Sequence, residues 1–203
     1  MKLYYSPGAC SLSAHITLRE AGLAFEPVQT STKTHKLEDG TDYYTINPLG
    51  YVPLLEMDDG TRLHEVPAIL QYVADQAPTK NLAPANGTLP RYRLQEWLTF
   101  IGTEIHKSFS PLFNAAMPEE GKQLMRDKLA KRFEWVDSQL AGKDYLMGDA
   151  FSVPDAYLFA VTRWTKPMNI DLSPFPNLSA HHARMHQRPA VQEALKVEGL
   201  QGT

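Results

Sequence analysis

The spacing of apolar residues predicts that the chain begins with a strand, a helix and a second strand. Residues 2–6 and 25–30 have the composition of short strands, and between them apolar residues recur at helical spacing from Cys10 to Ala21. Gly22 follows directly and is suited to end a helix. Because strands joined by such a helix run parallel, we expect a βαβ unit here.

Two more strand-like segments and a helix follow. Residues 52–57 and 61–64 are separated by a turn that contains Asp-Gly, which is a strong signal for a β-hairpin. The helical pattern that comes next has Pro67 in its first turn, where proline is tolerated, and Pro78 after its end. The first part of the chain therefore has the predicted order β-α-β, then β-β-α.

The composition changes between residues 77 and 90, where prolines and asparagines are concentrated as in a linker. Beyond this segment, apolar residues recur every three or four positions over 90–115 and 118–141, which indicates helices. The predicted fold class is α/β plus all-α. The expected parts are an α/β domain over residues 1–78, a linker over 79–88 and an all-helical domain over 89–203.

The stretch FSVPDAYLF contains a signal for the start of a helix. Ser152 and Asp155 are spaced as in a capping box, and Pro154 stands in the first turn. We expect a structural role for these residues, at the start of a buried helix.

The overall charge narrows the range of partners. The chain has 20 Lys and Arg against 23 Asp and Glu, a net charge of −3, so it has no basic surplus for nucleic acid or an anionic membrane. No apolar run has the length of a membrane span or of a secretory signal. A single cysteine excludes an internal disulfide and any multi-cysteine metal site, and we expect the protein in a reducing cytoplasm.

That cysteine, Cys10, follows Pro-Gly and precedes the first predicted helix. Unpaired N–H groups and the helix dipole favour a thiolate at such a position, whereas the alternative is a small, inert apolar residue. Ser13 stands where a dithiol motif has its second cysteine, so a redox cycle needs an external thiol such as glutathione. Ser11 and Ser13 either donate to a substrate thiolate or cap the helix.

Two later dipeptides could bind a ligand. Proline has no backbone N–H to donate to a neighbouring strand, so Val52-Pro53 indicates an edge strand or a turn. Glu65-Val66 stands at the start of the next helix, where backbone amides suit a ligand carboxylate and the Glu65 side chain suits an ammonium group. The alternative for Glu65 is an ordinary acidic helix start.

Histidines raise two further questions. Ile105 and Phe109 face the predicted core, so His106 lies beside the apolar stripe, either as a surface residue or as a catalytic one. His182 and His186 are four residues apart, but no third ligand is evident. We therefore expect no metal site and a solvated helix face at these two histidines.

Together these stretches resemble the glutathione S-transferases, and among them the bacterial beta class, over essentially the whole chain. The resemblance rests on MKLYYSPGACSLSAHITLREAGL, INPLGYVPLLEMDDGTRLHE, AILQYVAD, EWLTFIGTEIHK and FSVPDAYLF. It implies a thioredoxin-like domain (βαβ-ββα) that binds glutathione, followed by a helical bundle with the hydrophobic second-substrate site. It also implies a homodimer, glutathione as co-substrate and no permanently bound cofactor.

The resemblance also implies roles for particular residues. Cys10 corresponds to the catalytic cysteine that touches the glutathione sulfur, His106 to a histidine close to it, and Pro53 to a cis-proline. The expected glutathione-binding residues are Cys10, His35, Tyr51, Val52, Pro53, Glu65, Val66, Thr99, Thr103, Glu104, His106 and Lys107.

Three positions depart from the family pattern. Val66 replaces a common serine, so only its backbone amide can bind. His35 replaces a lysine, for which Lys36 is an alternative. Thr99 replaces an asparagine, so a polar contact of that asparagine, within the chain or across the dimer, is called into question.

These observations lead to two functional hypotheses of different classes. The first is an enzyme that conjugates glutathione to small hydrophobic electrophiles, with Cys10 either assisting or performing thiol–disulfide exchange; a dehalogenase is a variant of it. The second is a non-catalytic carrier or partner-binding protein on the same fold. The chain has all three ligand-facing features of the family, Cys10, Val52-Pro53 and Glu65, which favours the first hypothesis.

Overall fold

The computed structural model describes residues 1–201, and its sheet has the strand order β2-β1-β3-β4. The strands are β1 Lys2–Tyr5, β2 Glu26–Gln29, β3 Leu54–Glu56 and β4 Arg62–Leu63. β1 runs parallel to β2 and antiparallel to β3, and β3 and β4 form the hairpin. The predicted βαβ unit and Asp-Gly hairpin are therefore confirmed.

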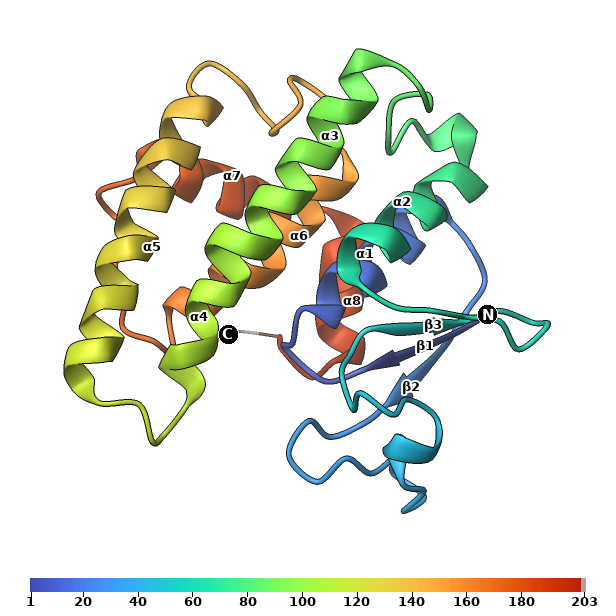
Figure 1. Ribbon diagram of the computed structural model, residues 1–203. Coiled ribbons are helices and arrows are strands. Elements are labelled where there is room, and N and C mark those ends of the chain that lie inside the picture. The colour runs from blue at the N-terminus through green and yellow to red at the C-terminus, as the bar shows by residue number, and fades with distance from the viewer. Residues whose placement is uncertain (202–203) are drawn as a thin grey trace. The chain divides into compact units, whose positions relative to one another are not determined.

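Helices make up most of the remaining structure (Figure 1). They are α1 Ser11–Ala21, α2 Val66–Gln76, α3 Leu89–Phe100, α4 Lys107–Phe113, α5 Glu119–Leu140, α6 Val153–Thr162, α7 Pro176–His186 and α8 Pro189–Val197. A π-helical segment, Ile101–His106, joins α3 to α4. Gly22 ends α1 with a φ of 68°, a left-handed conformation that favours glycine, as its position in the sequence predicts.

Alternation along the strands gives the sheet two apolar faces. Helices α1 and α2 pack against each other on one side of the sheet, where Leu3 and Leu55 are fully buried (Figure 1). On the other face Tyr4 and Leu54 form a small cluster with Tyr43, which begins a 3-10 turn between β2 and β3. Successive side chains of a strand point to opposite faces, so strands of only three or four residues place apolar side chains on both faces of the sheet.

The last helix packs with the first part of the chain. The compact units are residues 1–83 together with 188–201, and residues 84–187, whereas the sequence suggested an all-helical domain over 89–203. The difference arises because α8 packs against α1 and buries Val191, Ala194 and Leu195 there. Amphipathic spacing predicts that a helix has a buried face but does not identify its partner.

Polar contacts fasten this helix at both ends. Glu198 is buried after α8; its carboxylate accepts hydrogen bonds from the Gly8 amide (3.0 Å) and lies 2.9 Å from His15 Nδ1. At the start of α8, Arg188 forms a two-pronged ion pair with Glu20 of α1 at 2.6 and 3.0 Å. The turn that precedes Cys10 is therefore held by the C-terminal segment.

The capping box of the second unit is confirmed. Asp155 is fully buried, and its carboxylate accepts from the Ser152 amide and hydroxyl and from the Leu146 amide. It also lies 3.0 Å from His181 Nε2, so the motif connects α6 to α7 as well as starting α6.

The prediction of a solvated face at His182 and His186 is wrong. His182 stacks on Phe159 of α6, with ring centroids 4.7 Å apart, and His186 meets the same ring edge-on at 5.9 Å. Burial, with Arg163 nearby, lowers the pKa of His182 to about 4. The i, i+4 spacing reflects a face that packs on α6.

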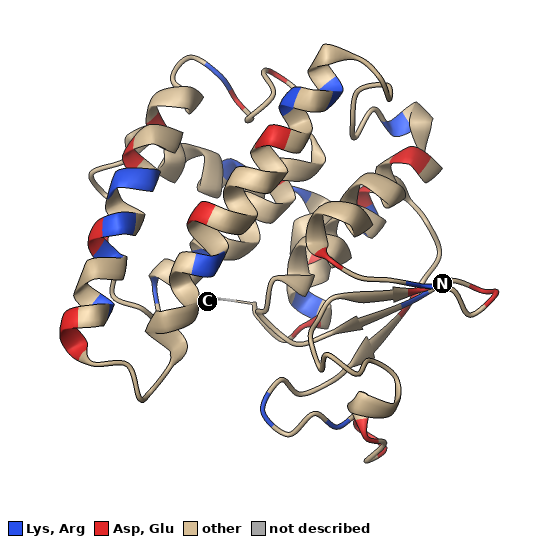
Figure 2. Ribbon diagram, in the orientation of Figure 1, with Lys and Arg blue, Asp and Glu red and all other residues tan. Residues whose placement is uncertain are grey.

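Charges are interleaved along the exposed helices. Figure 2 shows both signs along α5 instead of one continuous basic face. Within residues 1–201, no helix combines the length and the hydropathy needed to cross a membrane. No group of three or more His, Cys, Asp or Glu with the arrangement of a metal site occurs in the same described part of the chain.

Candidate active site

Three candidate segments of the first unit meet at one edge of the sheet. Tyr4 near the end of β1 pairs with Leu54 at the start of β3, and Leu55 pairs with Leu63 at the end of β4. The register therefore brings the loop after β1, the segment before β3 and the segment after β4 to the same edge. These segments carry Cys10, Val52-Pro53 and Glu65-Val66, respectively.

Cys10 occupies the N-cap position of α1. Its thiol lies 3.3 Å from the Val52 carbonyl oxygen, to which it donates, and the residue is 9% exposed. The Val52-Pro53 peptide bond is cis, as the resemblance implies. The predicted cysteine and the predicted backbone-pairing residue are thus in direct contact.

The serines beside Cys10 have structural partners. The Ser13 hydroxyl donates to the Cys10 carbonyl at 2.6 Å, and the Ser11 hydroxyl donates to the Ser6 carbonyl at 3.3 Å. Both side chains are fully buried. Both hydroxyls therefore bond to backbone carbonyls at or just before the start of α1.

Glu65 has an unusual backbone. Its φ of 68° and ψ of 124° lie in a region that costs a non-glycine residue about 1–3 kcal/mol, and its side chain is exposed at the N-cap of α2. The Val66 side chain is 3% exposed, so it contributes to the core while its amide belongs to the first turn of α2. Strain kept at an exposed acidic residue is typical of a functional position.

The loop before Pro53 carries the other two candidates of this unit. His35 stacks on Tyr44 with centroids 4.5 Å apart, and a Cβ on Gly50 would come within 2.9 Å of His35 Nδ1. Gly50 also has a φ of 65°, so close approach and backbone conformation both require glycine there. Tyr51, the next residue, is 66% exposed.

Two residues that the sequence reasoning missed hold this loop. Asn47 Nδ2 and the Tyr43 hydroxyl both donate to the Tyr51 carbonyl, at 2.8 and 2.9 Å. Asn47 also accepts from the Leu49 amide, which is the Asx-turn pattern that an Asn-Pro-Leu-Gly stretch could have revealed.

The second unit carries the remaining candidates on one run of helix. His106 ends the π-helical segment, half-buried, with its Nδ1 2.7 Å from the Tyr157 hydroxyl. Burial, with Lys107 nearby, lowers the pKa of His106 to about 4. The imidazole is therefore neutral at physiological pH and is a poor proton acceptor.

An aromatic cluster surrounds one side of His106. Trp164 receives edge contacts from His106, Phe109 and Phe113, with centroid separations of 5.0, 5.5 and 5.5 Å. Phe113 is 52% exposed, so the cluster extends from the core to the surface. It is apolar surface of the kind that a small hydrophobic molecule can contact.

The other predicted residues of this segment have varied surroundings. The Thr103 hydroxyl donates to the Thr99 carbonyl at 3.0 Å, and both residues are exposed, as is Lys107. Glu104 is bound by Arg132 at 2.7 Å and Lys128 at 3.5 Å, and the Arg132 hydrogen bond lowers the pKa of its carboxyl group. Glu104 therefore already has two cationic partners from α5.

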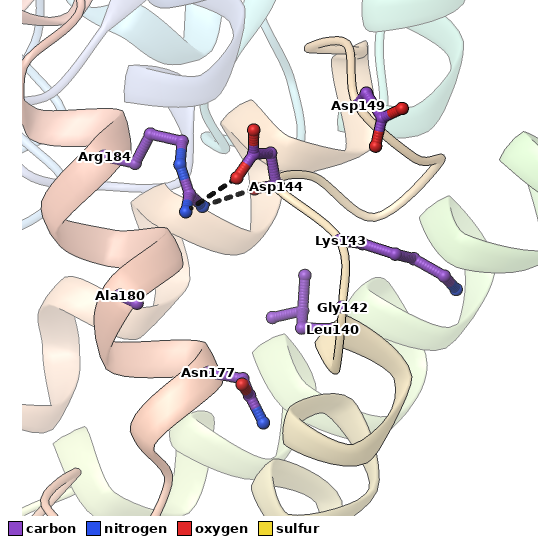
Figure 3. Close-up of a pocket in the computed structure, with 8 residues that line it drawn as sticks. All are labelled: Leu140, Gly142, Lys143, Asp144, Asp149, Asn177, Ala180 and Arg184. Atoms are coloured by element: carbon purple, nitrogen blue, oxygen red, sulfur yellow. Dashed lines mark hydrogen bonds and ion pairs between the residues drawn. The ribbon is translucent and has the colours of Figure 1, made fainter.

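A polar cavity of about 290 Å³ lies elsewhere in the second unit, between the end of α5, the following loop and α7 (Figure 3). Arg184 and Asp144 form an ion pair at its wall, 2.9 Å apart. None of the predicted site residues lines it. The chemistry described above therefore does not belong to this cavity.

Comparisons with known proteins identify the family of this chain. Residues 8–76 match the model for "Glutathione S-transferase, N-terminal domain", and residues 100–189 match that for "Glutathione S-transferase, C-terminal domain". The chain is 45% identical to glutathione S-transferase GstA of Escherichia coli O157:H7, over 98% of this chain and 100% of that protein. It is 38% identical to glutathione S-transferase GST-4.5 of Xanthomonas campestris pv. campestris, with the same coverage of 98% and 100%.

Solved structures give a similar result. A ternary complex of BphK, a bacterial glutathione S-transferase, is 58% identical with a TM-score of 0.96. A bacterial beta-class glutathione S-transferase from Sphingomonas chungbukensis is 48% identical with a TM-score of 0.95. Each comparison covers 98% of this chain and 100% of the other. The chain belongs to the glutathione S-transferase family, and its structural neighbours include members of the bacterial beta class.

Proposed function

We propose that this protein binds reduced glutathione and conjugates it to small hydrophobic electrophiles. The observation that carries the proposal is the 3.3 Å contact between the Cys10 thiol and the Val52 carbonyl, at the sheet edge that also bears the strained Glu65. A related structure from a sphingomonad, 48% identical to this chain, is a complex with glutathione. Family membership and this sheet edge together favour the enzyme over the non-catalytic carrier.

In the proposed reaction, the glutathione sulfur attacks the electrophilic carbon and forms a carbon–sulfur bond, while the leaving group takes the bonding electrons. The start of α1 favours negative charge, which supports a thiolate on glutathione. Three of the predicted residues orient the tripeptide: Glu65 binds its ammonium group, the Val66 amide binds its carboxylate and Val52 pairs with its backbone. No permanently bound cofactor takes part, and we place the protein in the cytoplasm.

Cys10 gives the site a second reaction, thiol–disulfide exchange. Its thiolate attacks the glutathione sulfur of a mixed disulfide and releases the other thiolate. A second glutathione then attacks the Cys10–glutathione disulfide, which releases oxidised glutathione and regenerates Cys10. The cycle needs an external thiol because Ser13, and not a second cysteine, stands at the resolving position.

Binding to immobilised glutathione tests the proposed function. We expect the protein to be retained and to be eluted by free glutathione. Glu65→Ala should weaken glutathione binding about tenfold, because a charge-assisted hydrogen bond to the ammonium group is lost. Titration calorimetry measures this change, and Glu26→Ala, at an exposed acid on β2, is the control that should leave affinity unchanged.

The results separate the two functional classes. Absence of both retention and turnover would favour the non-catalytic carrier. Equal affinity of Glu65→Ala and Glu26→Ala would contradict the role given to Glu65 while leaving glutathione binding intact.

We also propose a homodimer, formed through an aromatic patch of Trp97, Phe100 and Trp135. Their rings are in mutual contact between α3 and α5, with centroids 4.5–6.1 Å apart, and Trp135 is 43% exposed. Large aromatic side chains that remain partly exposed are enriched at protein interfaces.

Light scattering on purified protein tests this interface. The wild type should have twice the chain mass of 22.8 kDa, and Trp135→Glu should shift it towards the monomer, because a carboxylate would be buried without a partner. Val197→Glu, at an exposed apolar position of α8, should retain the dimer. A wild-type protein that stays monomeric at micromolar concentration would contradict the proposal.

A further inference from the structure

Tyr157 is in direct contact with His106 within the second unit. It lies on α6, 2% exposed, and its hydroxyl is 2.7 Å from His106 Nδ1. The ring planes are at 89°, with centroids 5.8 Å apart. The two rings are therefore in edge-to-face contact in addition to the contact of the Tyr157 hydroxyl with the imidazole. A buried tyrosine hydroxyl needs a partner, and here that partner is a candidate catalytic residue.

The direction of this hydrogen bond determines which nitrogen of His106 carries hydrogen. A separation of 2.7 Å is typical of an O–H donor, whereas N–H donors to oxygen cluster near 2.9–3.0 Å. A phenol is also a stronger acid than a neutral imidazole N–H and is the better donor of the two. We infer that Tyr157 is a positioning residue, which donates to His106 Nδ1 and so holds His106 as the tautomer with hydrogen on Nε2.

The surroundings of His106 limit what this tautomer can do. Trp164 lies against the imidazole on another side, with centroids 5.0 Å apart and a plane angle of 66°. The ring is therefore held by one polar and one apolar neighbour from the α6 segment and the turn that follows it. With Nδ1 occupied, Nε2–H remains as a hydrogen-bond donor and not as a base.

A donor of this kind stabilises an anionic sulfur without taking its proton. This step rests on the proposed function and on the role that the family resemblance implies for His106, that of a histidine close to the reactive cysteine. A neutral imidazole presents its Nε2–H in the same way through the physiological pH range, because its pKa is about 4. Tyr157 acts on the reaction only through the orientation and tautomer of this ring.

The inference is tested first by 15N NMR of histidine-labelled protein, with the His106 signals assigned by comparison with His106→Ala. The wild type should show the Nε2–H tautomer with a hydrogen-bonded Nδ1. In Tyr157→Phe these signals should shift towards a mixture of tautomers. Conjugation by Tyr157→Phe should have a kcat about fivefold to tenfold lower, with an unchanged KM for glutathione.

Tyr145→Phe is the matched control. Tyr145 is a buried tyrosine of the same unit, 8% exposed, whose ring packs on Phe151 and His181. It should leave the His106 signals and kcat as in the wild type. Thermal unfolding of both variants shows how much of any change comes from lost stability.

Several outcomes would overturn the inference. These are a wild-type His106 with hydrogen on Nδ1, a Tyr157→Phe protein with unaltered His106 signals, or equal losses of kcat in the two tyrosine variants. Failure of the proposed function is distinguishable, because an inactive wild type would still show, by NMR, whether Tyr157 fixes the tautomer.

Discussion

Replacement of Cys10 by alanine is expected to abolish thiol–disulfide exchange, with a loss of at least about a hundredfold, because the sulfur that forms the mixed disulfide is removed. Conjugation of a test electrophile should fall by only about tenfold or less. In that reaction the attacking sulfur belongs to glutathione, and Cys10 contributes only a neighbouring thiol. Initial rates with a glutathione mixed disulfide and with an aryl halide measure the two activities on the same preparation.

Cys10→Ser distinguishes the hydrogen bond to the Val52 carbonyl from the ability of residue 10 to form a disulfide. Serine retains a donor near the Val52 carbonyl but cannot form a disulfide, so exchange should be lost as in the alanine variant. Conjugation should remain closer to the wild type in Cys10→Ser than in Cys10→Ala. Exchange that persists in either variant would exclude Cys10 as the nucleophile.

Replacement of Asp155 by alanine should cause the largest loss of stability. Its fully buried carboxylate accepts from the amide and hydroxyl of Ser152 and the Leu146 amide, and lies 3.0 Å from His181 Nε2. Alanine leaves these groups buried without their acceptor, so we expect the free energy of unfolding to fall by about 4 kcal/mol. Urea denaturation followed by circular dichroism measures the change.

Asp144→Ala is the control in the same unit. Asp144 is exposed and pairs with Arg184 at 2.9 Å, and such surface pairs contribute about 0–1 kcal/mol. If Asp155→Ala were no less stable than Asp144→Ala, the carboxylate could not be the connection between α6 and α7.

Features with a local cause could be predicted from the sequence. Gly22 ends α1, the Asp-Gly turn closes the hairpin, and Ser152 with Asp155 starts α6, because each signal acts through the backbone of its own neighbours. These signals, with the helical spacing, were sufficient to predict an α/β part followed by helices.

Features that depend on distant segments could not be predicted in this way. The spacing of Val191, Ala194 and Leu195 does not reveal that they pack on α1, and that of His182 and His186 does not reveal Phe159. In each case the partner is chosen by tertiary packing, which one sequence pattern does not encode.

The candidate site shows the same division. Cys10 could be proposed from its place after Pro-Gly at a helix start, and the cis bond at Val52-Pro53 from the family resemblance. Tyr157 was placed in a buried helix, but its bond to His106 joins residues 51 positions apart. A tyrosine within an apolar helix indicates only that its hydroxyl needs some partner.

The return of α8 to the first unit has a consequence for synthesis on the ribosome. Domains of a nascent chain generally fold in order from the amino terminus, but here α8, the buried partner of α1, is translated only after the whole of residues 84–187. The sheet and its two helices must wait, with the α8-facing surface of α1 uncovered, while residues 84–187 are made and can fold. Completion of the Cys10 turn through Glu198 therefore comes after synthesis of the whole second unit, and a chain stalled before α8 would carry Cys10 without this support.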